Sequence, residues 1–296
     1  MNRGAVGRAL GAVSVLVIAL VVGACGATHG SSAPPVKGPS ATLRLSYPPG
    51  AYAYGYQASV NGTETLQSGD TRTLDMDLSA DGSWQVQPSG QSGASTVTAT
   101  FRNVKVSHPG SQTSSELTFV FGLAPDGVVS YQRGALPSAG SPVTAPGVDQ
   151  FLAILPSHSV RPRQSWSSNV SQPNPFGVGT ISYTASSRLL QYETVGGQRD
   201  AKVRTRTTIP VDLVVDLAKA ARGTGQTAAP PPQGQARYKG TVKLTNTTLI
   251  GLKSHRVDEA TNVADVDLQE IPLASPSGQP VPSFKGTETI HFHSQQ

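Results

Sequence analysis

Cysteine and charge are what this chain has least of. Cys25 is the single cysteine among 296 residues, which excludes an intramolecular disulfide. Charged residues make up 14% of the chain, against about a quarter in ordinary soluble domains. The fold must therefore draw its stability from a hydrophobic core and from hydrogen bonds between strands.

The excess of positive over negative charges is also small. The formal net charge is +5, and Arg3 and Arg8 near the start of the chain contribute two of those charges. The remaining excess is too weak to predict a nucleic-acid partner, although it is compatible with mild attraction to anionic lipid headgroups.

Motifs for catalysis are missing as well. The chain has no Gly-x-Ser-x-Gly nucleophile elbow and no phosphate-binding glycine loop. His291 and His293 share one face of an expected strand, but the sequence points to no third ligand. We therefore predict no catalytic residue, no metal site, no cofactor and no enzymatic activity.

The dominant pattern that is present has a period of two. Leu74, Met76 and Leu78 alternate with Asp75 and Asp77, as in a strand with one buried face. About a dozen such segments, separated by Gly- and Pro-rich stretches, predict a mainly β protein. We expect antiparallel sheet, curved or sandwich-like, with one or two short helices.

Three local signals refine this pattern. Ala80-Asp81-Gly82 predicts a tight hairpin turn, and Ala124-Pro125-Asp126-Gly127 predicts a second one. Between them the buried parity changes near Arg102-Asn103, which predicts a β-bulge.

The stretch 201–222 fits two structures. From Ala201 to Leu217 most odd positions are apolar and fit one face of a long strand, whereas Val211, Val214, Val215 and Ala218 also fit a helix. We favour a strand to about Ile209 followed by a short helix, and the alternative is a strand throughout.

The first 25 residues have the layout of an export signal. An apolar run of about 14 residues, from Ala9 to Val22, is too short to span a membrane easily. The segment Val22-Gly23-Ala24-Cys25 then resembles the lipid-attachment box of bacterial lipoproteins. That resemblance implies acylation of Cys25, cleavage before it, and a lipid anchor on the extracytoplasmic face of the cell membrane.

These signals give the domain organisation. We expect a signal peptide over 1–24, lipidated Cys25 with a flexible tether over 25–40, and a β-rich extracytoplasmic domain over 41–296. The domain is either one unit or two halves, at about 41–145 and 146–296.

Two further phrases resemble uncharacterised, secreted, β-rich lipoproteins of actinobacteria. The first is Leu155-Pro156, followed by Val160 and Ser165-Trp166, and the second is Tyr238-Lys239-Gly240-Thr241-Val242. Arg163-Gln164 stands where that family has Gly-Asp. The resemblance spans about Leu117 to His293, and the family carries no known catalytic residues.

Lys202, Arg204 and Arg206 alternate with Val203 and Thr205. This basic stripe is a candidate contact for an anionic partner, such as lipid headgroups or an envelope polymer. The expected function is binding or carrying a lipid or other apolar envelope ligand. The alternative is a structural protein that docks an envelope partner through an edge strand or the stripe.

Replacing Cys25 with Ser tests the anchor. Because acylation needs the thiol, Cys25→Ser should move the protein out of the membrane fraction and abolish labelling by an alkyne fatty acid. A Cys25→Ser protein that stays in the membrane fraction without label would contradict the predicted anchor.

Overall fold

The computed structural model describes residues 28–30, 39–89, 93–107, 116–131, 152–173, 177–178, 180–216, 235–272 and 280–295, and this part of the chain contains strands and no helix. The strands are β1 (Thr28–Gly30), β2 (Gly50–Thr65), β3 (Thr71–Pro88), β4 (Ser95–Ser107), β5 (Glu116–Leu123), β6 (Val129–Tyr131), β7 (Ser165–Pro173), β8 (Gly177–Val178), β9 (Thr180–Val195), β10 (Gln198–Asp216), β11 (Gln235–Gly251), β12 (Val257–Pro272) and β13 (Ser283–Gln295).

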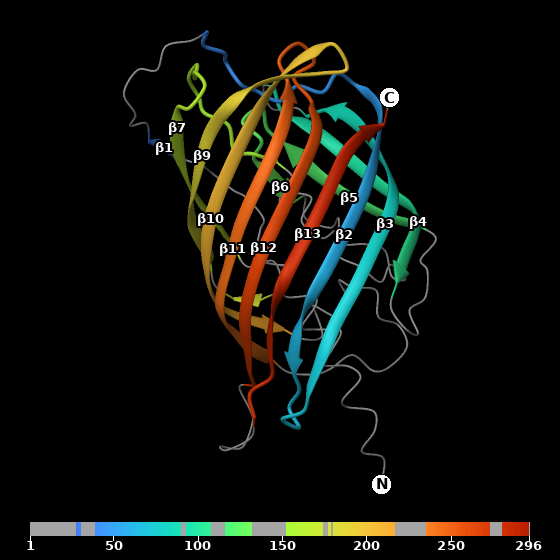
Figure 1. Ribbon diagram of the computed structural model, residues 1–296, viewed down its shortest axis with the longest axis vertical. Coiled ribbons are helices and arrows are strands. Elements are labelled where there is room, and N and C mark those ends of the chain that lie inside the picture. Colours follow the sequence, from blue (N-terminus) through green and yellow to red (C-terminus); the bar gives the residue numbers. More distant parts are fainter. Residues whose placement is uncertain are drawn as a thin grey trace.

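All thirteen strands belong to one antiparallel sheet that curls strongly (Figure 1). From edge to edge the order is β1, β7, β9, β10, β11, β12, β13, β2, β3, β4, β5 and β6, while β8 pairs separately with β10. The last strand, β13, pairs with the first long strand, β2, from Ser283↔Thr65 to Gln295↔Ala53. The stretches 41–145 and 146–296 therefore share one sheet.

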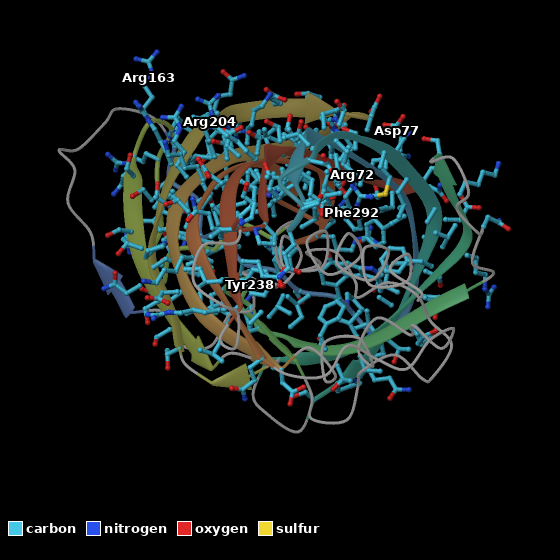
Figure 2. All side chains as sticks on the ribbon, turned by 90° about the horizontal axis from the view of Figure 1, so that it is seen from below. Arg72, Asp77, Arg163, Arg204, Tyr238 and Phe292 are labelled. Atoms are coloured by element: carbon cyan, nitrogen blue, oxygen red, sulfur yellow. The ribbon has the colours of Figure 1, made fainter. Side chains whose placement is uncertain are left out.

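Alternation along each strand separates the two faces of the sheet. On β11, Val242 and Leu244 are buried on the concave face, and Lys243 between them is exposed on the convex face. Viewed into the curl, Tyr238 and Phe292 lie on the inner side, whereas Arg163 and Arg204 lie on the outer side (Figure 2). The concave face thus holds the core.

Two segments outside the strands cover the upper end of the concave face, which is the end where the C-terminus lies in Figure 1. They are 41–47 and 152–160, joined by an isolated bridge between Ala41 and Val160. Both segments also bind the turn after β5, because Leu45 N donates to Pro125 O at 2.7 Å and Leu155 N to Asp126 O at 2.8 Å. The predicted turn over 124–127 is confirmed, with Gly127 at a φ of 85°.

The turn expected at Ala80-Asp81-Gly82 is wrong. β3 runs without interruption through these residues, and the register between β3 and β4 shifts between Ser79 and Asp81. Opposite the shift, Asn103 has a φ of 53° and donates a 2.8 Å hydrogen bond to Asp81. The Asp-Gly pair therefore belongs to the bulge that was expected near Arg102-Asn103, not to a turn.

The helix favoured after Ile209 is also wrong as far as the described residues reach. β10 continues to Asp216 and pairs with β11 from Asp200↔Gly251 to Asp216↔Gln235. A full ladder of partners outweighs a helical pattern of four apolar residues. Residues 217–222 lie outside the described part, and the expected short helices are not found within it.

The predicted tether contains a short strand. Thr28–Gly30 pairs with β7 from Thr28↔Asn169 to Gly30↔Ser167. Residues 25–27 and 31–38 lie outside the described part of the chain. Ordered structure therefore begins earlier than the boundary at 41.

Arg163 has a backbone conformation that glycine adopts more readily than other residues. Gln164 N donates to Arg161 O at 3.0 Å, which closes a turn with Pro162 second and Arg163 third. The φ of Arg163 is 70°, the left-handed value that the third position of a type II turn requires.

Replacing Arg163 with Gly should stabilise the protein by about 1 kcal/mol, because glycine adopts a positive φ without a Cβ clash. Urea unfolding followed by circular dichroism measures the change. The same exchange at Arg161, whose φ is not positive, is the control and should be destabilising. A loss of stability in Arg163→Gly would show that the arginine side chain outweighs the backbone strain.

Candidate ligand-binding face

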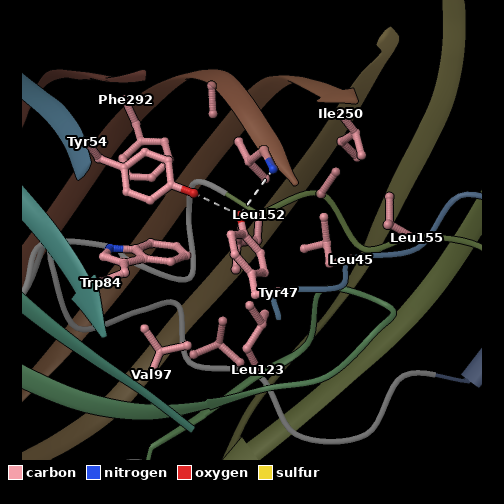
Figure 3. Close-up of a cluster of buried hydrophobic side chains, with 14 of the residues drawn as sticks. Leu45, Tyr47, Tyr54, Trp84, Val97, Leu123, Leu152, Leu155, Ile250 and Phe292 are labelled. Atoms are coloured by element: carbon pink, nitrogen blue, oxygen red, sulfur yellow. Dashed lines mark hydrogen bonds between the residues drawn. The ribbon is translucent and has the colours of Figure 1, made fainter. Parts of the chain in front are cut away.

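The upper half of the concave face is filled by aromatic and aliphatic side chains, part of which Figure 3 shows. Tyr54 stacks on Phe292 with ring centroids 4.2 Å apart, and Trp84 lies 4.9 Å from Tyr54. Tyr54 Oη donates to Tyr47 Oη, which accepts a second hydrogen bond from Val257 N at 3.1 Å. Segments 41–47 and 152–160 both contribute to this cluster, so the upper half is packed by the protein itself.

The lower half carries a second apolar cluster of a different kind. In the described part of the chain, every member is an inward side chain of the sheet: Val60, Leu74, Ile181, Ile209, Val211, Leu213, Ala236, Tyr238, Val242, Leu244, Ala264, Val266, Leu268 and Phe284. No member comes from the two covering segments. Strands β2, β3 and β9 to β13 thus contribute one broad apolar cluster, each member of which is at most 8% exposed.

A pair of glycines shapes the middle of this surface. Gly62 and Gly286 face each other across β2 and β13. A Cβ on Gly62 would lie 2.9 Å from the Phe284 ring, and one on Gly286 would lie 2.8 Å from it. The Phe284 ring therefore covers the pair, in the way that an aromatic side chain compensates for glycine in a sheet.

A belt of buried polar side chains separates the two clusters. Ser187, Thr205, Asn246 and Asn262 are register partners on β9, β10, β11 and β12. Ser187 Oγ lies 2.8 Å from Thr205 Oγ1, and Asn246 Oδ1 accepts from Thr248 at 2.6 Å. The belt is thus a continuous polar row across four strands in an otherwise apolar face.

Glu288 lies on β13 one row below the belt. Its register partners are Ala264 on β12 and Val60 on β2, both members of the lower cluster. The side chain is 5% exposed, and its Oε2 has no hydrogen-bond partner. Burial raises the pKa of Glu288 to about 7, because an apolar surrounding disfavours the charged form.

Two more buried acids lie toward the lower end, and both have partners. Glu270 accepts a 2.9 Å hydrogen bond from Tyr238 Oη, and its burial raises its pKa. Glu64 forms an ion pair with Arg72. Among the described inward positions, Glu288 is thus the acid with an unsatisfied oxygen.

A separate acidic pair lies near the turns at the upper end. Asp200 is fully buried, and neither of its carboxylate oxygens meets a hydrogen-bond donor. Burial, followed by the negative charge of Asp258, raises the pKa of Asp200 to about 6. The two carboxyl groups are satisfied together when one of them is protonated.

The predicted basic stripe lies on the convex face, away from these clusters. Lys202 forms a 2.8 Å ion pair with Glu193. Arg204 faces Arg188 across β9 and β10, a pairing of like charges that is unfavourable. Arg206 is exposed. The stripe is therefore a solvated surface. Glu193 neutralises the charge of Lys202, and Arg188 of β9 adds a positive charge beside Arg204.

Two other sequence candidates, His291 and His293, also lie outside the concave face. Cys25 is outside the described residues. His291 bonds to Thr261 at 3.0 Å and the His293 ring lies over Gly55, so the two histidines do not converge on an ion. No group of three or more His, Cys, Asp or Glu in the described part is placed to hold a metal.

The convex face carries a groove of about 760 Å³ over β11, β12 and β13. Its lining is largely polar and charged, and Lys285 lies 3.5 Å from Asp267 within it. Such a solvated surface does not suit an apolar ligand. Of the described residues, none belongs to a helix long and apolar enough to cross a membrane.

Comparison with known proteins gives no relative. No family model matches the chain, and no curated protein matches its sequence. The proposed function therefore rests on the geometry of the site.

Glu288→Gln should remove a pH-dependent loss of stability. The pKa of Glu288 is raised by folding, so its contribution is most favourable below about pH 4.5 and is lost as the pH rises to about 7. The variant should gain roughly 3 kcal/mol over the parent at pH 8 and nothing at pH 4. Urea unfolding at both pH values measures this.

Glu259→Gln is the matched control, because Glu259 is exposed on the same sheet. It should leave the free energy of unfolding unchanged within about 0.5 kcal/mol at both pH values. An equal gain for Glu288→Gln at pH 4 and pH 8 would show that ionisation of Glu288 is not its cause.

Proposed function

We propose that the protein is a non-enzymatic, lipid-anchored protein of the cell envelope that binds or carries a lipid or another apolar ligand. The ligand lies on the lower half of the concave face. The observation that carries this proposal is the lower cluster itself, in which fourteen apolar side chains from one sheet adjoin a buried polar belt.

This arrangement matches what an amphiphile needs. Apolar side chains remove acyl chains from water, at about 25 cal/mol for each Å² buried. The belt and Glu288 place polar atoms at one border of the same surface, where a headgroup finds hydrogen-bond partners. The upper half is packed by Tyr54, Trp84 and Phe292 and is assigned a structural role.

The proposed anchor adjoins the sheet edge. Only two residues separate Cys25 from β1, which pairs with β7, so an acyl group on Cys25 begins within about 11 Å of that edge. Arg188 on the neighbouring β9 pairs with Ser165 of β7.

Native mass spectrometry tests the ligand proposal. A soluble Gly26–Gln296 form, secreted from a bacterial host, should carry a reproducible extra mass. Extraction with chloroform and methanol should remove that mass, and its value gives the ligand class. The extracted protein is the control for adducts that are not lipid.

A clean ligand-free mass at high signal would contradict the carrier proposal. It would favour the second candidate, docking of an envelope partner through the convex basic surface. The observation behind this alternative is the juxtaposition of Arg204 and Arg188, a destabilising pair that a partner's acidic groups would neutralise.

A further inference from the structure

Two carboxyl groups meet at the upper end of the sheet. Asp200 on β10 is fully buried, and neither of its oxygens has a hydrogen-bond partner. The carboxyl group of Asp258 on β12 lies within hydrogen-bonding reach of it. Two ionised carboxylates can only accept hydrogen bonds, so their contact becomes a hydrogen bond when one of them carries a proton.

A β-bulge and a glycine bring Asp258 to this position. The register between β11 and β12 shifts after Leu249, which leaves Asp258 as the extra residue of the bulge. A bulge aims its extra side chain away from the regular strand direction. Gly251 is the register partner of Asp200, and a Cβ on it would lie 2.9 Å from Asp258 Oδ2. The missing side chain of Gly251 therefore leaves room for Asp258.

The same bulge holds one of the two covering segments. Ser46 N donates to His255 O at 2.8 Å, and Val257 N donates to Tyr47 Oη at 3.1 Å. Both contacts are made within three residues of Asp258. A displacement of Asp258 would therefore reach the segment that covers the upper end of the concave face.

The surrounding charges leave burial as the strongest influence on the pair. Burial raises the pKa of Asp200 and of Asp258. Glu193 on β9 also disfavours the charged form of Asp200, although Glu193 itself pairs with Lys202 at 2.8 Å. Arg256 favours the charged form of Asp258 without outweighing its burial. The elements around the pair also carry Arg44, Arg199, Lys253, His255 and Glu259.

We propose that Asp200 and Asp258 form a pH-dependent contact that controls the docking of the covering segment 41–47. One shared proton joins the two carboxyl groups and fixes the bulge against β10. Loss of that proton leaves two negative charges side by side, and the bulge and the segment loosen. Folding raises the pKa of Asp200 from 3.8 to about 6, so the stabilisation is complete below about pH 4 and is lost as the pH rises through about 6.

Hydrogen exchange followed by mass spectrometry tests this contact on the full chain in mild detergent. Protection factors, which correct for the pH dependence of intrinsic exchange, are compared at pH 5 and pH 8. Peptides covering 41–47 and 251–258 report on the segment and the bulge. Their protection should fall about tenfold at pH 8, because pH 5 lies about one unit below the raised pKa of Asp200 and each unit is worth about tenfold.

Asp200→Asn should abolish this dependence, because the new amide donates a hydrogen bond to Asp258 at either pH. Its protection at pH 8 should match that of the parent at pH 5 within about twofold. Asp258→Asn places the same donor on the other side of the contact and should behave alike, so the test survives if one variant fails to fold. Glu259→Gln, which is exposed beside Asp258, is the control and should keep the tenfold fall.

Three results would overturn the proposal. The first is constant protection of the parent from pH 5 to pH 8. The second is an equal fall in the parent and in both asparagine variants, which would place the pH dependence elsewhere. The third is protection of the parent at pH 8 that calcium maintains and a chelator removes, because a divalent cation rather than a proton would then join the two carboxyl groups.

Discussion

Burial of the segment Leu43–Tyr47 beneath the upper end of the sheet is the contact on which the rest of the structure depends. A sheet that curls this strongly leaves an apolar concave face that must be covered. Leu43, Leu45 and Tyr47 supply part of that cover, each at most 5% exposed. Their backbone also connects distant parts of the sheet, because Leu45 N donates to Pro125 O and Ser46 N to His255 O. The upper half thereby becomes a fixed support for the lower half.

The sequence predicted strands well wherever one face is buried, because a period of two identifies a half-buried strand without knowledge of its neighbours. The predicted turn at Asp81-Gly82 was wrong, because a bulge and a hairpin turn favour the same residues. The partner Asn103, which distinguishes the two, is 22 positions away. The prediction also failed after Ile209 because the pairing of β10 with β11 is a tertiary contact. The positive φ of Arg163 was not predicted, because arginine carries no sequence signal for a left-handed conformation.

The candidate site could be anticipated only in part. The basic stripe was placed correctly on one strand face, but its pairing with Glu193 depends on register and not on spacing. Glu288 was missed although a signal existed, because it shares the inward parity of Phe284, Ile290 and Phe292. An acid at an inward position of an apolar strand is a stronger indication of a site than acids such as Asp265, which alternate outward.

The same position carries a cost in stability. An apolar residue at Glu288 would complete the lower cluster with Val60 and Ala264 and would avoid the cost of burying a carboxyl group. The chain instead keeps an acid with an unsatisfied oxygen beside a row of Ser, Thr and Asn. The upper cluster, with its stacked Tyr54 and Phe292, provides the compensating stability. A fold of this kind carries its stacked aromatic side chains at one end, while the inward-facing acids Glu64, Glu270 and Glu288 lie toward the other.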